Sequence, residues 1–310
     1  MSNSNKIILA VVGLGLAILA PYLVYPVFLM KLLCFALFAT AFNLMLGYGG
    51  LLSFGHAAFF GGAGYFAGHA LKVWGLPTEL GILFGAVAAG LIGLAVGLLA
   101  IRRQGIYFAM ITLAMAQMVY FFFISAPFTG GENGLQGVPR GLGLGFLNLQ
   151  NDKVMYFYVL AITVAGILLV ARTVNSPFGQ ILSAIRDNED RARSLGYDIE
   201  RYKLVAFVLS ATLAGLAGAT KTVVFQLASL TDAHWHMSGE VVLMTLLGGL
   251  GTIIGPAVGA AIVITLQNTL ASGPLAAWVP VTLGVIFVIC VLAFRRGVVG
   301  EIRALIRRSF

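Results

Sequence analysis

Charged residues are scarce in this sequence. Asp, Glu, Lys and Arg together make up 10% of its 310 residues, and hydrophobic residues make up 60%. An ordinary soluble domain is about 25% charged. This balance excludes a water-soluble fold. Because a chain that crosses the hydrocarbon core must satisfy its backbone polar groups internally, we expect an all-α polytopic membrane protein.

Cysteine and catalytic motifs are also nearly absent. The two cysteines, Cys34 and Cys290, lie in apolar runs without partner spacing, so the sequence predicts neither a disulfide framework nor a metal site. The pair His234 and His236 has no further ligand at metal spacing. The stretch "GLAGATKT" lacks the Gly that a phosphate-binding loop places before its Lys, and no H-E-x-x-H, G-x-S-x-G or C-x-x-C occurs. We therefore expect no cofactor, no metal and no enzymatic activity.

The energy source is indicated by another absence. The long apolar runs contain no Asp or Glu, although a proton-coupled carrier usually keeps one. This favours a permease driven by a separate ATPase. The alternative is an ion-gradient-coupled secondary transporter of a small zwitterionic solute.

The charge that is present is mostly positive, with a net charge of +8. Most basic residues lie between or after apolar runs, where they set membrane orientation, and this argues against nucleic-acid binding. Arg102 and Arg103, residues 172–203 and the tail from Arg295 all indicate the cytoplasmic side. We expect both termini to be cytoplasmic.

Charge-free runs give the number of crossings, because one span needs about 20 apolar residues. Residues 7–30 are too long for a signal-peptide core and predict a retained first span. Two spans fit between Lys31 and Lys72, and three short ones fit in residues 241–294. Single spans are expected at residues 80–101, 104–131, 154–171 and 204–226. The total is ten, or eight if the glycine-rich pairs are re-entrant.

Two glycine-rich stretches interrupt these runs, at residues 47–55 and at "GGLGTIIGP", residues 248–256. Non-helical backbone at membrane depth survives only inside protein or beside a water-filled cavity, so two interruptions indicate a substrate route between broken helices. The alternative is that the glycines only allow close helix packing. The candidate translocation path comprises Gly47, Gly49, Gly50, Ser53, Gly55, His56, Gly248, Gly249, Gly251, Gly255 and Pro256.

Two ionisable residues within the apolar runs need an interpretation. His56 follows the first interruption and is a functional candidate; alternatively its imidazole only satisfies backbone carbonyls that the interruption frees. Lys221 lies 17 residues after Leu204, about 26 Å along a helix. We expect its side chain to extend to the outer interface.

The one large hydrophilic segment, residues 172–203, holds 11 of the chain's 30 charged residues. Ser176 and Pro177 predict a helix start, and Gly196 predicts its end. The helix has one apolar face and a mixed-charge end, which suits a protein partner better than lipid headgroups. The candidate ATPase-coupling residues are Pro177, Phe178, Ile181, Leu182, Ile185, Arg186, Asp187, Glu189 and Arg191. Charge reversal at Arg186 and Asp187 is expected to weaken ATPase association.

Four stretches together resemble a known family. They are "GYGGLLSFGHAAFFGGAGYFAG", "TGGENGLQGVP", "SPFGQILSAIRDNEDRARSLGYDIERYKLVAFVLSATLAGLAGA" and "GEVVLMTLLGGLGTIIGPAVGA". In this order they resemble the LivM-type permease subunits of bacterial branched-chain amino acid ABC importers. Lys221 departs from the family pattern, which usually has an aromatic residue there.

The resemblance implies one transmembrane permease domain over residues 1–310, in the lipid of the bacterial inner membrane. It implies a heterodimer with a LivH-type permease, two cytosolic ABC ATPases and a periplasmic substrate-binding protein. By the same analogy residues 176–196 are the coupling helix, and the two interruptions line the translocation route. The cargo stays open, since relatives also carry other amino acids, short amides and urea.

Overall fold

We describe the chain from a computed structural model. The structure describes residues 15, 17–143, 145, 147–271, 278, 281–282, 284–286, 288 and 297–301. Its long helices are α2 (Pro26–Asn43), α3 (His56–Lys72), α4 (Thr78–Ala100), α5 (Ile106–Ser125), α6 (Asp152–Val174), α9 (Ile199–Phe225), α10 (Trp235–Gly248) and α11 (Gly255–Ala271). Shorter helical elements are the π-helical turn η1 (Leu44–Tyr48), η2 (Pro127–Thr129), η3 (Gly131–Asn133), α7 (Pro177–Asp187), α8 (Glu189–Ser194) and η4 (Leu230–Ala233).

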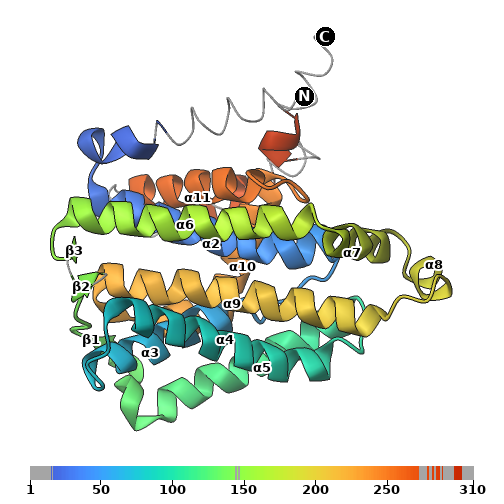
Figure 1. The fold of residues 1–310 in the computed structure, drawn as a ribbon, viewed down its shortest axis with the longest axis horizontal. Coiled ribbons are helices and arrows are strands. Elements are labelled where there is room, and N and C mark those ends of the chain that lie inside the picture. The colour runs from blue at the N-terminus through green and yellow to red at the C-terminus, as the bar shows by residue number, and fades with distance from the viewer. Residues whose placement is uncertain are drawn as a thin grey trace.

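Most of the long helices, among them α2, α4, α6, α9 and α11, run along the long axis of the molecule (Figure 1). Helices α7 and α8 project at one end, and the short strands lie at the opposite end (Figure 1). Helix α9 packs on α2, α3 and α4 and forms the centre. In the most apolar windows of α2 and α9, 67% of residues are buried, against 22% in α5. Helix α5 is therefore peripheral, with an apolar face that the other described residues leave uncovered.

Small residues let the central helices approach closely. A Cβ added at Gly85 of α4 would lie 2.6 Å from the carbonyl oxygen of Ala63 in α3. A Cβ at Gly218 of α9 would overlap the carbonyl group of Phe60. Such contacts are typical of helix packing in membranes, where small residues allow backbone to meet backbone. For these glycines the close-packing interpretation holds.

The strands are confined to the connections at one end. β1 (Leu135–Gln136) pairs antiparallel with β4 (Leu227–Ala228), and β2 (Leu142–Gly143) pairs with β3 (Leu147–Asn148). Arg140 fixes this region, because its guanidinium bonds Asp152 and the carbonyl oxygen of Val224, both at 2.7 Å. This end thus forms a structured cap over the helices.

The multi-pass helical architecture is confirmed, since five helices are long and apolar enough to cross a membrane: α2 with η1, α4, α5, α6 and α9. The boundary expected at Lys31 is wrong: α2 runs through this residue because Pro26 starts the helix. Residues 7–14 and 16 of the span expected at residues 7–30, and most of the last crossing expected before residue 294, lie outside the described residues. The total of eight to ten stays a prediction.

Candidate functional site

The two glycine-rich stretches, distant in sequence, meet in space. The chain is non-helical at residues 49–55, between η1 and α3, and at residues 249–254, between α10 and α11. We call these the first and second segments. The stretches meet at Gly47, whose carbonyl oxygen lies 3.6 Å from the Cβ position of Gly251. The side-chain amide of Asn43, in α2, holds the second segment at this junction: its Nδ2 donates to the carbonyl oxygen of Thr252 at 2.9 Å, and its Oδ1 accepts from the backbone N of Gly251 at 3.1 Å.

Gly47 makes this junction possible. A Cβ on Gly47 would overlap the side chain of Asn43 and would lie 2.7 Å from the backbone N of Gly251. Any larger residue would therefore push the second segment away from α2. The conformations of Gly249 (φ 117°) and Gly251 (φ 68°) are also ones that other residues rarely adopt. Glycine is needed here for both space and backbone conformation.

Hydroxyl groups from two helices, and one of its own, hold the first segment. The Oγ of Ser238, in α10, accepts from the backbone N of Ala57 at 2.9 Å and donates to the carbonyl oxygen of Phe54 at 2.7 Å. Since the N-cap of α3 is Gly55, which has no side chain, Ser238 supplies the missing cap. Thr112 in α5 accepts from the backbone N of Phe54 at 3.2 Å, and Ser53 accepts from Gly55.

His56 is fully buried behind the first segment. Its ring lies against those of Phe42, Phe59 and Phe207. Its Nε2 is 2.8 Å from the Oγ of Ser210, which donates its own proton to the carbonyl oxygen of Ala41, so the Nε2–H of His56 is the donor. The histidine therefore ties α3 to α9 and, through Ser210, to α2. The imidazole thus bonds a side-chain hydroxyl and not the freed backbone carbonyls expected from the sequence, and a functional role for His56 stays a prediction.

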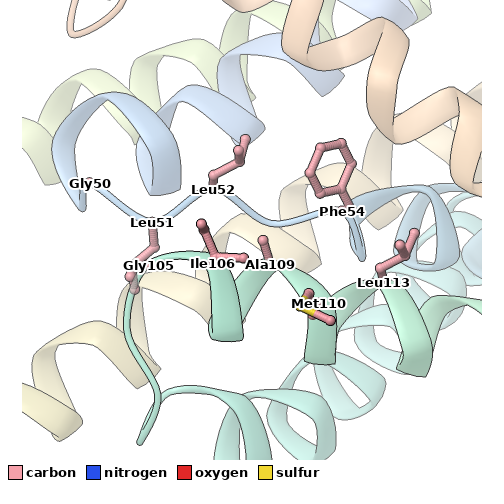
Figure 2. Close-up of a pocket in the computed structure, with 9 residues that line it drawn as sticks. All are labelled: Gly50, Leu51, Leu52, Phe54, Gly105, Ile106, Ala109, Met110 and Leu113. Carbon is pink, nitrogen blue, oxygen red and sulfur yellow. The ribbon is translucent and has the colours of Figure 1, made fainter.

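A cavity of about 450 Å³ lies between the first segment and α5 (Figure 2). Its size falls within the range of roughly 300–1,000 Å³ that small-molecule sites occupy. Of the predicted path residues only Gly50 is among those that line it. The others, which composition alone does not single out, are Leu51, Leu52, Phe54, Gly105, Ile106, Ala109, Met110 and Leu113. The lining is apolar. The cavity forms because the fold places α5 alongside the first segment.

Several predicted path residues serve helix packing. A Cβ at Gly248 would overlap the carbonyl group of Gly255, and one at Gly259 would overlap that of Met244. Helices α10 and α11 therefore meet through glycine contacts. Gly49, Gly248, Gly249, Gly255 and Pro256 are buried, and Gly251 is half-buried. A role for them in a translocation path stays a prediction.

The charged loop folds as two helices, so the single helix expected over residues 176–196 is wrong. Ser176 caps α7 by accepting from the backbone N of Gly179. Asn188 then adopts an extended conformation and caps α8, because its Oδ1 accepts from the backbone N of Arg191 at 2.9 Å. The end near Gly196 is as expected, with φ 89° at this residue.

The apolar face of α7 points into the chain's own core. Leu182 and Ile185 are buried, and Phe178 and Ile181 are half-buried; Phe178 stacks on Tyr202 of α9. Pro177, Asp187 and Arg191 are exposed. The outward surface of α7 and α8 therefore carries mainly polar side chains, and the turn after α8 exposes Leu195 and Tyr197.

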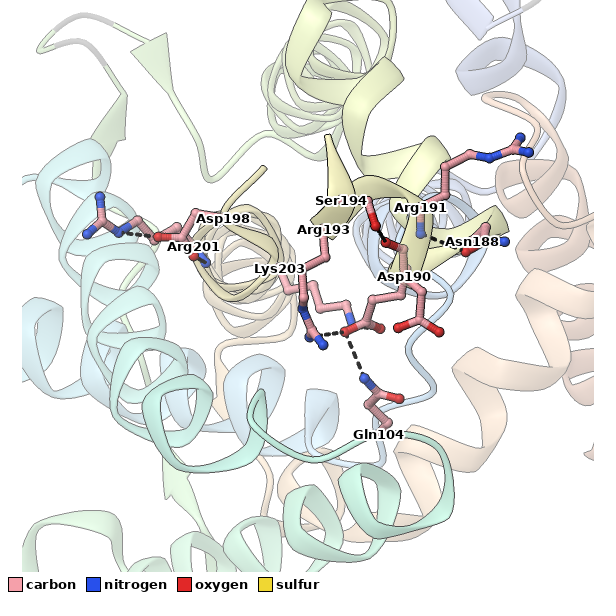
Figure 3. A network of polar contacts seen from close by, with 10 residues as sticks. Gln104, Asn188, Asp190, Arg191, Arg193, Ser194, Asp198, Arg201 and Lys203 are labelled. Carbon is pink, nitrogen blue, oxygen red and sulfur yellow. Dashed lines mark hydrogen bonds and ion pairs between the residues drawn. The ribbon is translucent and has the colours of Figure 1, made fainter. Parts of the chain in front are cut away.

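Glu189 is the centre of a polar cluster that fixes α8. Its carboxylate lies 2.6 Å from the Nζ of Lys203, which is only 5% exposed, and 2.7 Å from the Nε2 of Gln104. Figure 3 shows Lys203, Arg193 and Gln104 converging at this point. The cluster joins α8, α9 and the loop before α5. It also puts Arg102 and Arg103 at the same end of the molecule as the charged loop, as expected from the sequence.

At the opposite end Lys221 forms a buried ion pair. Its Nζ lies 2.5 Å from Asp232 in η4, and the two side chains are 15% and 10% exposed. The expectation that Lys221 extends to the outer interface is wrong, since the fold supplies an acidic partner from the following loop. His234 accepts from the backbone N of His236, and among the described residues no group of three or more potential ligands could hold a metal.

A family model for "Branched-chain amino acid transport system / permease component" matches residues 26–293. The chain belongs to this family. The match covers every element described above.

Relatives of known name agree with this assignment. The chain is 27% identical over 232 residues to the high-affinity branched-chain amino acid transport permease LivM of Escherichia coli, covering 67% of this chain and 53% of that protein. It is 29% identical to LivM of Salmonella typhimurium, covering 53% and 45%, and 29% identical to the autoinducer 2 import permease LsrC of Klebsiella pneumoniae, covering 63% and 55%.

These matches confirm the LivM-type resemblance expected from the sequence. The chain spans about half the length of the curated relatives it matches. No solved structure gives a significant match.

Proposed function

We propose that this permease-family chain is a transmembrane subunit of an ATP-driven ABC importer for amino acids, most simply branched-chain amino acids, and that it has no catalytic activity of its own. The observation that carries the proposal is the junction of the two non-helical segments. It lies beside an apolar cavity and is bonded directly to α7, the first helix of the charged loop. The candidate substrate route and the helix that would transmit movement from the ATPase therefore meet at one place.

The charged loop supports an ATPase dock on the cytosolic side. Basic residues near the membrane mark the cytoplasm, and both basic loops lie at the end that carries α7 and α8 (Figure 1). Because Leu182 and Ile185 are buried, the docking surface consists of the exposed residues Asp187, Arg191 and Leu195 instead. Two cytosolic ATPases, one under each permease subunit, complete this half of the proposed assembly.

The uncovered face of α5 supports a second permease subunit. Met110, Met118 and Phe121 are each about 60% exposed on this helix. An apolar face of this kind suits lipid or another helix. The cavity lies along the same helix, so a LivH-type partner packed here would close the route between the two subunits. A periplasmic binding protein would deliver cargo at the strand-bearing end, in the bacterial inner membrane.

The apolar lining of the cavity indicates which class of solute would be carried. The chain is also similar to sugar permeases, among them the ribose import permease RbsC of Bacillus subtilis, 29% identical over 190 residues. Burying a hydroxyl without a hydrogen-bond partner costs about 1–3 kcal/mol, and the side chains here are aliphatic or aromatic apart from Met110. Such a lining favours an apolar side chain over a sugar.

The test is uptake by the isolated assembly. The tagged chain is purified in mild detergent from its native membrane with its bound subunits, which mass spectrometry identifies, and is reconstituted into proteoliposomes. We expect copurifying ATPases and ATP-dependent uptake of labelled leucine, with ribose as the control solute. Uptake driven by an ion gradient without ATP would instead support the secondary-transporter alternative.

A further inference from the structure

Arg186, in the last turn of α7, reaches out of the charged loop to the junction. Its Nη1 donates to the carbonyl oxygen of Gly47 at 2.6 Å. Gly47 lies in η1, the final turn before the first segment, where carbonyl groups lack intrahelical partners. A guanidinium placed there satisfies one of these carbonyls and also complements the negative end of the helix dipole.

The stem of Arg186 packs on the first segment itself. A Cβ on Gly50 would lie 2.6 Å from the Cγ of Arg186, and Gly50 has φ 69°. Glycine is therefore needed here both for conformation and to admit the arginine. The same side chain thus contacts both the turn before the segment, at Gly47, and the segment itself, at Gly50.

The second segment is one contact further away. The Cβ position of Gly251 lies 3.8 Å from Nη1 of Arg186, and the backbone N of Gly251 is bonded to Asn43. Asn43, in α2, lies one helical turn before Gly47. Asn43 and Arg186 therefore contact the junction from successive turns. A displacement of Arg186 would therefore change the packing of both segments.

We propose that Arg186 is the positioning residue that transmits movement of α7 to the junction of the two segments, rather than a docking contact for the ATPase. The inference rests on the proposed function, and it adds which atoms connect the charged loop to the junction. The Nε and Nη2 of Arg186 bond Asp187 of the same turn, at 3.0 and 2.8 Å. This pairing holds the guanidinium so that Nη1 stays aimed at Gly47. Movement of α7 then carries Gly47 along or breaks the bond.

The two roles of Arg186 predict different defects. Arg186→Ala is compared with Arg186→Lys, which keeps the charge and one donor, and with Arg103→Ala, an exposed arginine at the same end. In the reconstituted complex we expect Arg186→Ala to keep its ATPase content and its basal ATP hydrolysis. Leucine transported per ATP falls by about tenfold, the effect of losing one charge-assisted hydrogen bond. Arg186→Lys recovers part of this ratio, and Arg103→Ala keeps it.

Loss of the ATPase from Arg186→Ala, or an unchanged ratio of transport to hydrolysis, would overturn the inference. A second readout does not depend on transport. Hydrogen–deuterium exchange of the full complex should be faster over residues 47–55 in Arg186→Ala than in Arg103→Ala, and equal exchange contradicts the inference. If the wild-type complex shows no ATP-dependent uptake, the proposed function fails, while the exchange measurement still tests whether Arg186 holds the junction.

Discussion

The buried ion pair between Lys221 and Asp232 permits a quantitative prediction. Both side chains are nearly excluded from solvent, and the Nζ of Lys221 also lies 5.6–5.8 Å from the ring centres of Phe35, Phe60 and Phe225. Replacing Lys221 by Met keeps the length of the side chain but leaves a buried carboxylate without its partner. Breaking a buried pair in this way costs about 3–5 kcal/mol.

The size of this effect can be compared with that of an exposed pair in the same chain. Arg201 and Asp198 are 2.8 Å apart with side chains 85% and 50% exposed, and pairs of this kind contribute about 0–1 kcal/mol. At roughly 2 °C per kcal/mol for a large domain, Lys221→Met should lower the melting temperature by about 6–10 °C, and Arg201→Ala by at most about 2 °C.

The assay is thermal unfolding of the purified protein in detergent. The double variant Lys221→Met with Asp232→Leu removes both charges and should regain most of the lost stability, because an apolar pair of similar size can replace a buried ion pair. If Lys221→Met shifts the melting temperature no more than Arg201→Ala does, the pair is not energetically buried and the reasoning is refuted.

Two further predictions concern the route and the core. Met110→Trp should fill the cavity and reduce leucine uptake without lowering the melting temperature, whereas Leu91→Trp, similarly exposed on α4 and outside the cavity, should transport normally; equal uptake by both would remove the cavity from the route. Gly218→Ala should destabilise the protein by about 1–3 kcal/mol through overpacking against the Phe60 carbonyl group. Gly239→Ala, with open space around its Cβ, should be neutral or stabilising in thermal unfolding.

Part of the site could be predicted from local signals. The density of glycine around Gly47 and Gly248 indicates interrupted helices, and Ser176 followed by Pro177 indicates the start of α7. The break at Asn188 was missed, although Asn is a common N-cap, because the charge pattern continues across it. Asn43, Thr112, Ser210 and Ser238 were also missed, since single polar residues in apolar runs carry no spacing signal.

Composition and patterning alone determine that this chain is a polytopic helical membrane protein, because hydrocarbon admits only long apolar segments whose backbone is bonded internally. They also locate the charged loop and the two glycine-rich stretches, since charge and glycine are costly within such segments. Only the tertiary structure decides that the stretches meet at Gly47 and Gly251, that Arg186 points inward to Gly47, and that Lys221 pairs with Asp232. Each of these depends on helices distant in sequence lying side by side, and hydropathy does not encode that arrangement.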